Sequence, residues 1–338
     1  MTFNDVLEIR NGRNQRKVEN PEGKYPIYGS GGVMGYADEY ICEVETVVVG
    51  RKGSINNPIF VEEPFWNVDT AFGLVAKRDV LLPRYLFYFC KYFDFERLNK
   101  AVTIPSLTKS DLLRIEINLP NLDRQQSIVD KLFGIEHTIA LRQQELNKLD
   151  DLIKARFVEI LKVSELSDEI TIEAITERVK VGFVGTCEKY YTDDSGIPML
   201  RTGNITEKGI NIKDLKYVTP EFHEKNKKSQ IHSGDLLIAR HGSNGQANVY
   251  SGPDAQCLNA VVIVPNQAKA RSVFLAGLIN SPMVKKQIDK TLVGSTQHVV
   301  NTKSIANLVV RIPDLDVQQQ YEEFVNQVDK SKFVLQNK

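Results

Sequence analysis

Residues 107–126 read LTKSDLLRIEINLPNLDRQQ, and residues 301–319 read NTKSIANLVVRIPDLDVQQ. The two stretches share a Thr-Lys-Ser triplet, a segment built around proline, leucine and aspartate, and a Gln-Gln pair. The separation between the copies slips by one residue between the triplet and the proline segment. A repeat of this size predicts a tandem duplication, with two similar units related by an approximate twofold. We therefore expect a binding partner that also has two parts.

A weaker echo lies upstream of each copy. Residues 50–54 (GRKGS) parallel residues 239–243 (ARHGS), and the same spacing pairs residues 70–71 with residues 259–260. The duplication therefore extends over most of the chain.

Length and composition indicate an ordinary globular protein with room for two cores. The chain has 338 residues, and its 43 Lys and Arg residues balance 43 Asp and Glu residues. Net charge therefore gives no reason to expect nucleic acid or a membrane, but two local patches are basic. One is residues 10–24. The other is residues 269–303, which contain six basic residues and a single acidic residue, Asp289. Such patches suit phosphate contact, although each alone is equally typical of solvated surface. The six cations are Lys269, Arg271, Lys285, Lys286, Lys290 and Lys303.

Cysteine usage and hydropathy indicate the compartment. The four cysteines are scattered, without a CxxC pair or metal-ligand spacing, as in proteins of a reducing compartment. We recognise no secretory signal and no apolar run of bilayer length. We expect a cytoplasmic protein that makes no membrane contact.

Short apolar runs punctuated by turns predict a sheet in each unit. In the first, we expect strands at 46–49, 72–76 and 115–119, with an aromatic helix at 83–98. In the second, we expect strands at 235–239, 260–264 and 308–312, with helices at 273–280 and 282–292.

Residues 123–162 carry apolar side chains at alternating spacings of three and four, which predicts a coiled-coil helix. At about 1.5 Å per residue it spans on the order of 60 Å, so it acts as a spacer. A shorter stretch from 316 to 338 repeats the pattern and is the expected antiparallel partner. A homodimer through the long helix is the alternative.

The predicted fold class is therefore α+β. Two similar mixed α/β domains are separated by the long central helix, which pairs antiparallel with the C-terminal helix. The predicted divisions are a first domain at 1–121, the central helix at 122–163, a second domain at 164–313 and a short helix at 314–338.

We find no self-contained catalytic apparatus. The glycine-rich stretch at 29–35 lacks the Gly-Lys-Ser/Thr ending of a phosphate loop and is better interpreted as a turn between strands. Residues 106–109 fit Ser-x-x-Lys without the companion motifs of a serine acylase. The five histidines show no metal-ligand spacing.

Polar, glycine-spaced loops follow equivalent predicted strands in both units, at 51–57 and at 240–248, and each begins with arginine. Arginine can bond a guanine edge and Asn or Gln an adenine edge, while Lys and Ser contact phosphates. Either loop alone is also typical of a hairpin turn. Two such loops at equivalent positions favour nucleic-acid recognition.

Several ordered motifs resemble the type I restriction–modification specificity (S) subunits. In the first unit they are residues 24–32 (KYPIYGSGG), 50–54 (GRKGS) and 66–71 (WNVDTA). In the second they are residues 197–205 (IPMLRTGNI), 234–237 (GDLL), 240–242 (RHG) and 258–260 (LNA). The likeness covers nearly the whole chain in the order recognition domain, helix, recognition domain, helix. Each motif is weak alone, but the doubled, ordered set is specific.

This resemblance implies a non-catalytic reader of double-stranded DNA. Each target recognition domain would bind one half of a split, asymmetric target, while the helices set the spacing and dock two methyltransferase (M) subunits. A restriction/translocase (R) subunit would join for cleavage. The chain itself would need no cofactor, because S-adenosylmethionine, ATP and Mg²⁺ would belong to those partners.

Two departures qualify the resemblance. The C-terminal helix is about half as long as the central one, so either the central helix has an unpaired tip or a methyltransferase helix covers it. Recognition loops vary within the family, so the candidate DNA contacts come only from the equivalent loops. They are Arg51, Lys52, Ser54 and Asn57 in the first unit, and Arg201, Arg240, Ser243, Asn244 and Gln246 in the second.

Two rival functions remain open. A complete restriction or modification enzyme would show methyl transfer by the chain alone. A protein-binding adaptor that homodimerises through its coiled coil would form a stable dimer without salt-dependent DNA binding.

Overall fold

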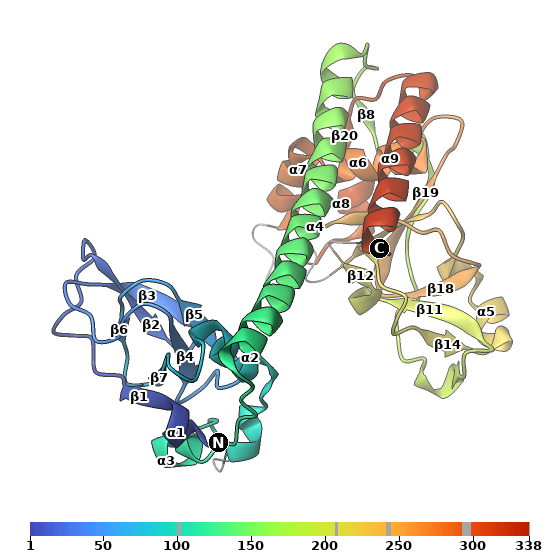
Figure 1. The fold of residues 1–338 in the computed structure, drawn as a ribbon. Helices are drawn as coiled ribbons and strands as arrows, with labels where there is room; N and C mark the ends of the chain where they lie inside the picture. The colour runs from blue at the N-terminus through green and yellow to red at the C-terminus, as the bar shows by residue number, and fades with distance from the viewer. Residues whose placement is uncertain (100–102, 207–208, 241–244, 293–298, 338) are drawn as a thin grey trace. The chain divides into compact units, whose positions relative to one another are not determined.

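One helix, α4 (Leu122–Val163), contributes 42 residues to the computed structural model (Figure 1). The structure describes residues 1–99, 103–206, 209–240, 245–292 and 299–337. The chain divides into two compact units, Met1–Leu141 and Arg142–Lys338, and the division falls within α4. Along the chain, α4 therefore separates two β-sheet-rich domains of an α+β fold, as the sequence predicts.

The main sheet of unit 1 has the strand order β1-β7-β4-β5 with antiparallel pairing throughout. Its inner strands are β7 and β4, and in β4 all five residues of the sequence TVVVG are buried. Such a β-branched run fits a strand covered on both faces. The bounds are β1 (Leu7–Asn11), β4 (Thr46–Gly50), β5 (Ile59–Val61) and β7 (Ala71–Ala76).

The aromatic segment after this sheet forms α2 (Pro83–Tyr92), which packs on β4, β5 and β7. The prediction of one helix at 83–98 is wrong at its C-terminal end, because the chain is extended at Phe93 and resumes as the 3₁₀ turn η1 (Phe95–Leu98). The interruption between α2 and η1 is stabilised by a side chain from an earlier part of the chain. The side chain of Asn56 accepts from the Phe95 amide at 2.6 Å and donates to Asp94 at 2.9 Å.

A second sheet in unit 1 has the order β3-β2-β6, with β2 and β6 parallel. The predicted strand at 115–119 is wrong: a single bridge joins Thr2 to Glu116, since only the first residues of the chain pair with this segment. The remaining bounds are α1 (Phe3–Val6), β2 (Tyr25–Gly29), β3 (Gly32–Ala37), β6 (Trp66–Asn67) and α3 (Lys109–Leu113).

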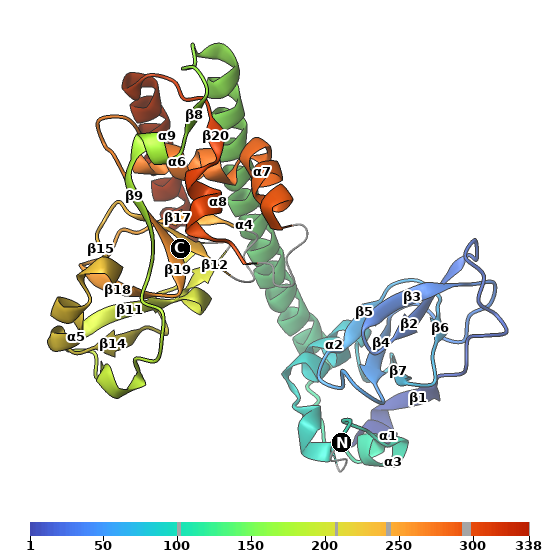
Figure 2. The same ribbon diagram turned by 180° about the vertical axis from the view of Figure 1, so that it is seen from behind.

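Unit 2 repeats the main sheet in the same order, β9-β19-β16-β17, again fully antiparallel. Helix α6 (Ser272–Asn280) packs on it against β17 and α9, and α7 (Pro282–Leu292) follows as predicted (Figure 2). The predicted strand at 308–312 shrinks to two residues, because its partner β8 is equally short. The strands are β8 (Ile170–Thr171), β9 (Thr176–Val181), β16 (Leu236–Ala239), β17 (Ala247–Val249), β19 (Ala260–Pro265) and β20 (Val309–Val310).

The second sheet of unit 2 has the order β10-β14-β11-β18-β15 and again contains one parallel pair, β11 with β18. Its strands are β10 (Tyr191–Thr192), β11 (Ile197–Arg201), β14 (Lys216–Val218), β15 (Gln230–Ile231) and β18 (Ala255–Leu258). The other elements are η2 (Glu173–Ile175), η3 (Glu188–Tyr190), η4 (Thr202–Asn204), β12 (Ile205–Thr206), β13 (Gly209–Ile210), α5 (Pro220–Lys225), η5 (Lys227–Ser229) and α8 (Thr302–Ala306).

The one-residue slip between the repeat copies disappears in the structure. Thr108 caps the N-terminus of α3, and its equivalent as the cap of α8 is Asn301 rather than Thr302. Each cap accepts from the amide three residues later, at 3.1 Å from Asp111 and 2.8 Å from Ser304. Matching the caps therefore keeps one constant separation as far as the Gln-Gln pairs.

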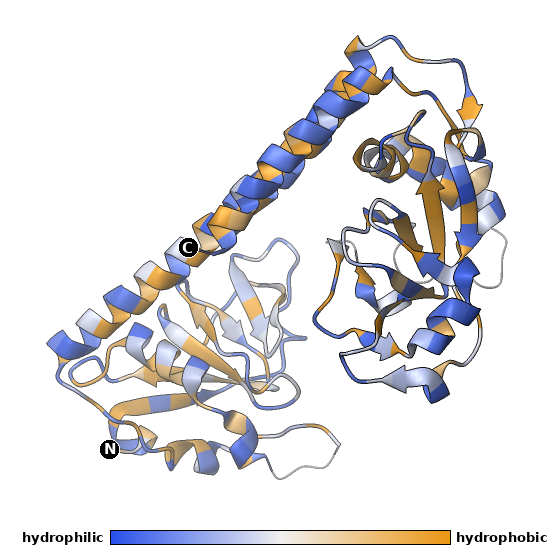
Figure 3. Cartoon of the chain, turned by 90° about the vertical axis from the view of Figure 1, so that its right-hand side faces the viewer, coloured by the Kyte–Doolittle hydropathy of each residue, from blue (hydrophilic) through white to orange (hydrophobic). Residues whose placement is uncertain are grey.

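Helix α9 (Leu315–Gln336) pairs antiparallel with the C-terminal half of α4, within unit 2. Tyr321 packs edge-on against Phe157, and towards the other end of α9 the Lys332 ammonium lies 2.7 Å from Asp150. Polar and apolar residues are interspersed along α4 (Figure 3). Earlier on the predicted seam, Ile135 and Ile139 are 56% and 61% exposed, so α9 is too short to cover the whole stripe.

Candidate nucleic-acid interface

The two predicted loops begin at equivalent places and are held by equivalent backbone bonds. In unit 1, Arg51 follows β4, and its carbonyl accepts from the Leu107 amide at 2.9 Å. In unit 2, Arg240 follows β16, and its carbonyl accepts from the Val300 amide at 3.1 Å. In each unit, the backbone of this arginine is therefore held by the segment just before a capped short helix, which is α3 in unit 1 and α8 in unit 2.

In unit 1, the turn between β2 and β3 lies against the loop that begins at Arg51. A Cβ on Gly50 would lie 2.9 Å from the Cβ of Ser30, and one on Gly53, where φ is +80°, would lie 3.8 Å from its Oγ. The prediction of a turn is confirmed at residues 30–31, whereas residues 32–35 of the glycine-rich stretch belong to β3. This turn also packs against the Arg51 loop. We call Ser30, Gly50, Arg51 and Gly53 the loop corner of unit 1.

In unit 2, Asn259 joins the Arg240 loop to the segment that follows β11 by hydrogen bonds. Its backbone carbonyl accepts from Thr202 Oγ1 at 3.1 Å, and its side-chain Oδ1 accepts from Arg240 Nη1 at 2.8 Å. Asn259 has a left-handed φ of +54°, which asparagine tolerates better than most residues. The loop corner of unit 2 therefore consists of Arg201, Thr202, Arg240 and Asn259, and it joins two predicted site residues.

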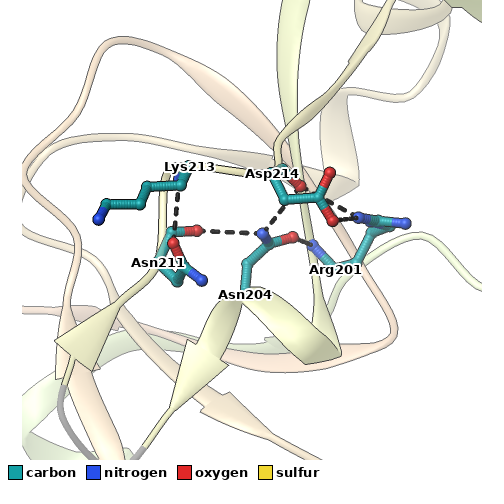
Figure 4. A network of polar contacts seen from close by, with 5 residues as sticks. All are labelled: Arg201, Asn204, Asn211, Lys213 and Asp214. Atoms are coloured by element: carbon teal, nitrogen blue, oxygen red, sulfur yellow. Dashed lines mark hydrogen bonds and ion pairs between the residues drawn. The ribbon is translucent and has the colours of Figure 1, made fainter. Parts of the chain in front are cut away.

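Arg201 itself is held by a polar network (Figure 4). Its Nη2 donates to the Asp214 carbonyl at 3.1 Å and lies 3.4 Å from the Asp214 carboxylate. Asn204, which is 3% exposed, accepts from the Arg201 amide at 2.9 Å and donates to the carbonyls of Asn211 and Asp214. Within the described residues, the buried Nε of Arg201 has no hydrogen-bond partner. The guanidinium is thus oriented but not fully satisfied.

The remaining predicted residues differ in availability. In unit 1, Arg51, Lys52, Ser54 and Asn57 are all exposed. The Arg51 guanidinium makes a 3.5 Å bond to the Asp69 carbonyl and lies over the Phe72 ring, 5.8 Å from its centroid. In unit 2, Arg240 and Gln246 are half-buried, and Ser243 and Asn244 lie outside the described residues. The neighbouring Asn56 lies in the first predicted loop and is not one of the predicted DNA contacts. Its side chain bonds Phe95 and Asp94 within unit 1.

Three loop-corner side chains, those of Ser30, Thr202 and Asn259, were missed by sequence reasoning. They lie within motifs noted in the sequence, but their contacts depend on strand pairing. The repeat offered a signal for Asn259, because it matches residues 70–71 with residues 259–260. Thr70 lies next to the first loop, since its carbonyl accepts from the Arg51 amide at 2.8 Å, so its match Asn259 is expected next to the second loop.

The thiols near these sheets are unsuited to nucleophilic chemistry. All four cysteines are buried, and burial raises the pKa of Cys42 and of Cys257 to about 12. Over the described residues, no group of His, Cys, Asp and Glu side chains has the geometry to hold a metal ion. Nor does that part of the chain contain a helix long and apolar enough to cross a bilayer. What the loop corners offer chemically is hydrogen bonding and positive charge.

Two arginine-bearing loop corners follow equivalent strands of duplicated antiparallel sheets, and a long helix links the two units along the chain. These features define a binding subunit of two domains. The model of the type I restriction modification DNA specificity domain matches residues 1–151 and 164–338. The chain belongs to this family.

Curated relatives and solved structures agree with this assignment. The type I restriction enzyme MjaVIII specificity subunit of Methanocaldococcus jannaschii is 20% identical over 314 residues, 86% of this chain and 74% of that protein. The EcoBI specificity subunit of Escherichia coli is 20% identical over 339 residues, covering 91% and 71%. The fold resembles the crystal structure of the type I S subunit from M. genitalium, with a TM-score of 0.65 and 16% identity over 100% of this chain and 90% of that one.

The chain is thus a DNA specificity subunit of a type I restriction–modification system. It is itself non-catalytic.

Proposed function

We propose that each unit reads one half of a two-part, asymmetric DNA target, with residues 1–121 and 164–313 as the recognition domains. The observation that carries this proposal is the arginine at the first loop position of both units, held by equivalent backbone bonds after equivalent strands. Because the side chains around it differ, with Ser30 in one corner and Arg201 in the other, the two half-sites differ in sequence.

Within each loop we assign roles by chemistry. Arg51, Arg201 and Arg240 contact guanine edges, while Asn57, Asn244 and Gln246 contact adenine edges. Lys52, Ser54 and Ser243 contact backbone phosphates and set the register of the duplex. Arg201 and Arg240 contact DNA through the guanidinium N–H groups that do not donate to Asp214, Val300 or Asn259 within unit 2.

The helices at 122–163 and 314–338 set the gap between the half-sites and dock two M subunits. An R subunit then joins for cleavage. S-adenosylmethionine, ATP and Mg²⁺ reside on these partners, and the complex acts on double-stranded DNA in the cytoplasm.

The direct test is co-purification of the chain with its methyltransferase, followed by methylome sequencing of cells that express both. We expect methylation within a split target whose halves are different. A continuous or palindromic target contradicts the proposal, and methyl transfer by the chain alone would contradict its non-catalytic role.

The arginine assignment has its own test in Arg240→Ala. Loss of a base-edge contact should weaken binding to the target by about 1–3 kcal/mol and relax selectivity at one base pair of the second half-site. Arg51→Ala is the matched variant and should act only on the first half-site. Equal losses on target and scrambled duplexes would show that these arginines contact phosphates instead.

A further inference from the structure

A cavity of about 500 Å³ lies in unit 2 between the C-terminal end of α7 and the helix α8. These two helices pack against each other (Figure 2). Among the described residues, those that line the cavity include two lysines and several hydroxyl and amide side chains, and none is acidic. They are Gln287, Lys290, Thr291, Asn301, Lys303, Ser304, Asn307 and Leu308.

The walls of this cavity are held in place by hydrogen bonds. Gln287 makes two bonds with the backbone of Val309, donating at 2.8 Å and accepting at 3.0 Å. Asn301 accepts from the Ser304 amide at 2.8 Å. Beneath the rim, Ile288 and Ile305 are almost fully buried in the core of unit 2. Any ligand would therefore meet a preformed surface.

Lys290 and Lys303 are both exposed, and neither has an ion-pair partner in the part of the chain that the structure describes. Other cations of the same basic segment are engaged, since Lys269 bonds the Ala174 carbonyl and Arg271 pairs with Glu322. Two ammonium groups around one cavity repel each other unless an anion joins them. The charge thus favours an anionic ligand.

The cavity adjoins the loop corner of unit 2. Asn301 directly follows Val300, whose amide bonds the Arg240 carbonyl at 3.1 Å and whose carbonyl accepts from Arg240 Nε at 3.3 Å. Lysine contacts phosphate as a point charge, and Ser, Thr and Asn side chains bond phosphate oxygens. We propose that the lysine cavity binds a phosphate of the DNA backbone next to the bases that unit 2 reads. This inference rests on the proposed DNA-reading function.

The corresponding place in unit 1 has a different character. When the caps Thr108 and Asn301 are matched, Lys303 corresponds to Ser110 and Ser304 to Asp111. Lys109, the cation of this segment, is engaged with the Ile9 carbonyl at 2.7 Å. The phosphate contact made by the cavity between α7 and α8 therefore has no equivalent at this place in unit 1.

The test uses the complex with the methyltransferase subunits and two duplexes, one with the methylated target and one scrambled. Lys290→Ala and Lys303→Ala should each weaken binding to both duplexes equally. Each should also reduce the slope of log affinity against log salt by about 0.9, the loss of one phosphate contact. Lys286→Ala is the matched control, because Lys286 is exposed on the same helix but does not line the cavity.

Three results would overturn the proposal. One is an unchanged salt slope in both lysine variants, and another is a slope change as large in Lys286→Ala. The third is a loss of affinity confined to the target duplex. In each case the wild-type complex would still prefer its target, so the proposed function would stand. A wild-type complex without salt-dependent binding would overturn both.

Discussion

Gln125 and Gln318 make the same three hydrogen bonds, one set in each unit. Both side chains are fully buried. In each, Oε1 accepts from a backbone amide at the start of the helix that covers the main sheet, and Nε2 donates to two backbone carbonyls. The partners are Leu82, Val80 and Pro120 in unit 1, and Arg271, Lys269 and Pro313 in unit 2.

This clamp predicts a large loss of stability on truncation. Gln318→Ala leaves one amide and two carbonyls without that partner in a buried site, and we expect a loss of about 2–4 kcal/mol in the free energy of unfolding. Gln319→Ala is the control, because the Gln319 side chain bonds Glu323 at 2.9 Å on an exposed face of α9. Denaturant unfolding of the full chain measures both. Comparable losses in the two variants would show that the clamp contributes little.

Two helical glycines are expected to respond with opposite sign to alanine. A Cβ on Gly134 in α4 would meet no atom within 4 Å, so Gly134→Ala should stabilise the chain by about 0.5–1 kcal/mol. A Cβ on Gly277 in α6 would lie 3.0 Å from both Phe157 and Tyr321, which α4 and α9 press against it. Gly277→Ala should therefore be neutral or destabilising. Stabilisation by both changes, seen in thermal unfolding, would contradict this packing.

Asp235 predicts a pH dependence of stability. It is 4% exposed, and burial raises the pKa of its carboxyl despite a 2.9 Å bond from the His232 amide. The folded state then holds the proton more tightly than the unfolded chain. This stabilisation is complete below the ordinary Asp pKa of about 4 and is lost as the pH rises through the raised value.

Asp235→Asn keeps a hydrogen-bond acceptor and removes the buried charge. We expect the variant to be more stable than the wild type at neutral pH, with a difference that shrinks as the pH falls. Denaturant unfolding across this pH range measures it. A variant that is less stable at neutral pH would mean that the charge is favourable where it lies.

Asn259 should act as a positioning residue for Arg240. Asn259→Gly tolerates the left-handed backbone but removes the acceptor that orients the guanidinium. Selectivity at the base pair assigned to Arg240 should fall by less than in Arg240→Ala, with no change in the salt slope. If Arg240→Ala and the double variant differed as much as wild type and Asn259→Gly, the two residues would act independently.

Much of the fold could be predicted because its signals are local. The β-branched run at Val47–Val49 and the heptad spacing of α4 each specify one element regardless of their surroundings. The end of α2 and the fate of residues 115–119 could not be predicted in this way. Both depend on partners far along the chain, Asn56 for the first and Thr2 for the second.

For the candidate site, the sequence identified the loops and their arginines but not their states. The restraint of Arg201 by Asp214 and the contact of Ser30 with Gly50 exist only once strands from distant segments are paired. From the sequence alone follow the duplication, the order of domains and helices, and the family resemblance, because each is a pattern along the chain. Which copies of a motif are equivalent, which side chains meet, and which lysines stay unpaired were decided by tertiary structure, since these properties depend on distances between residues far apart in the sequence.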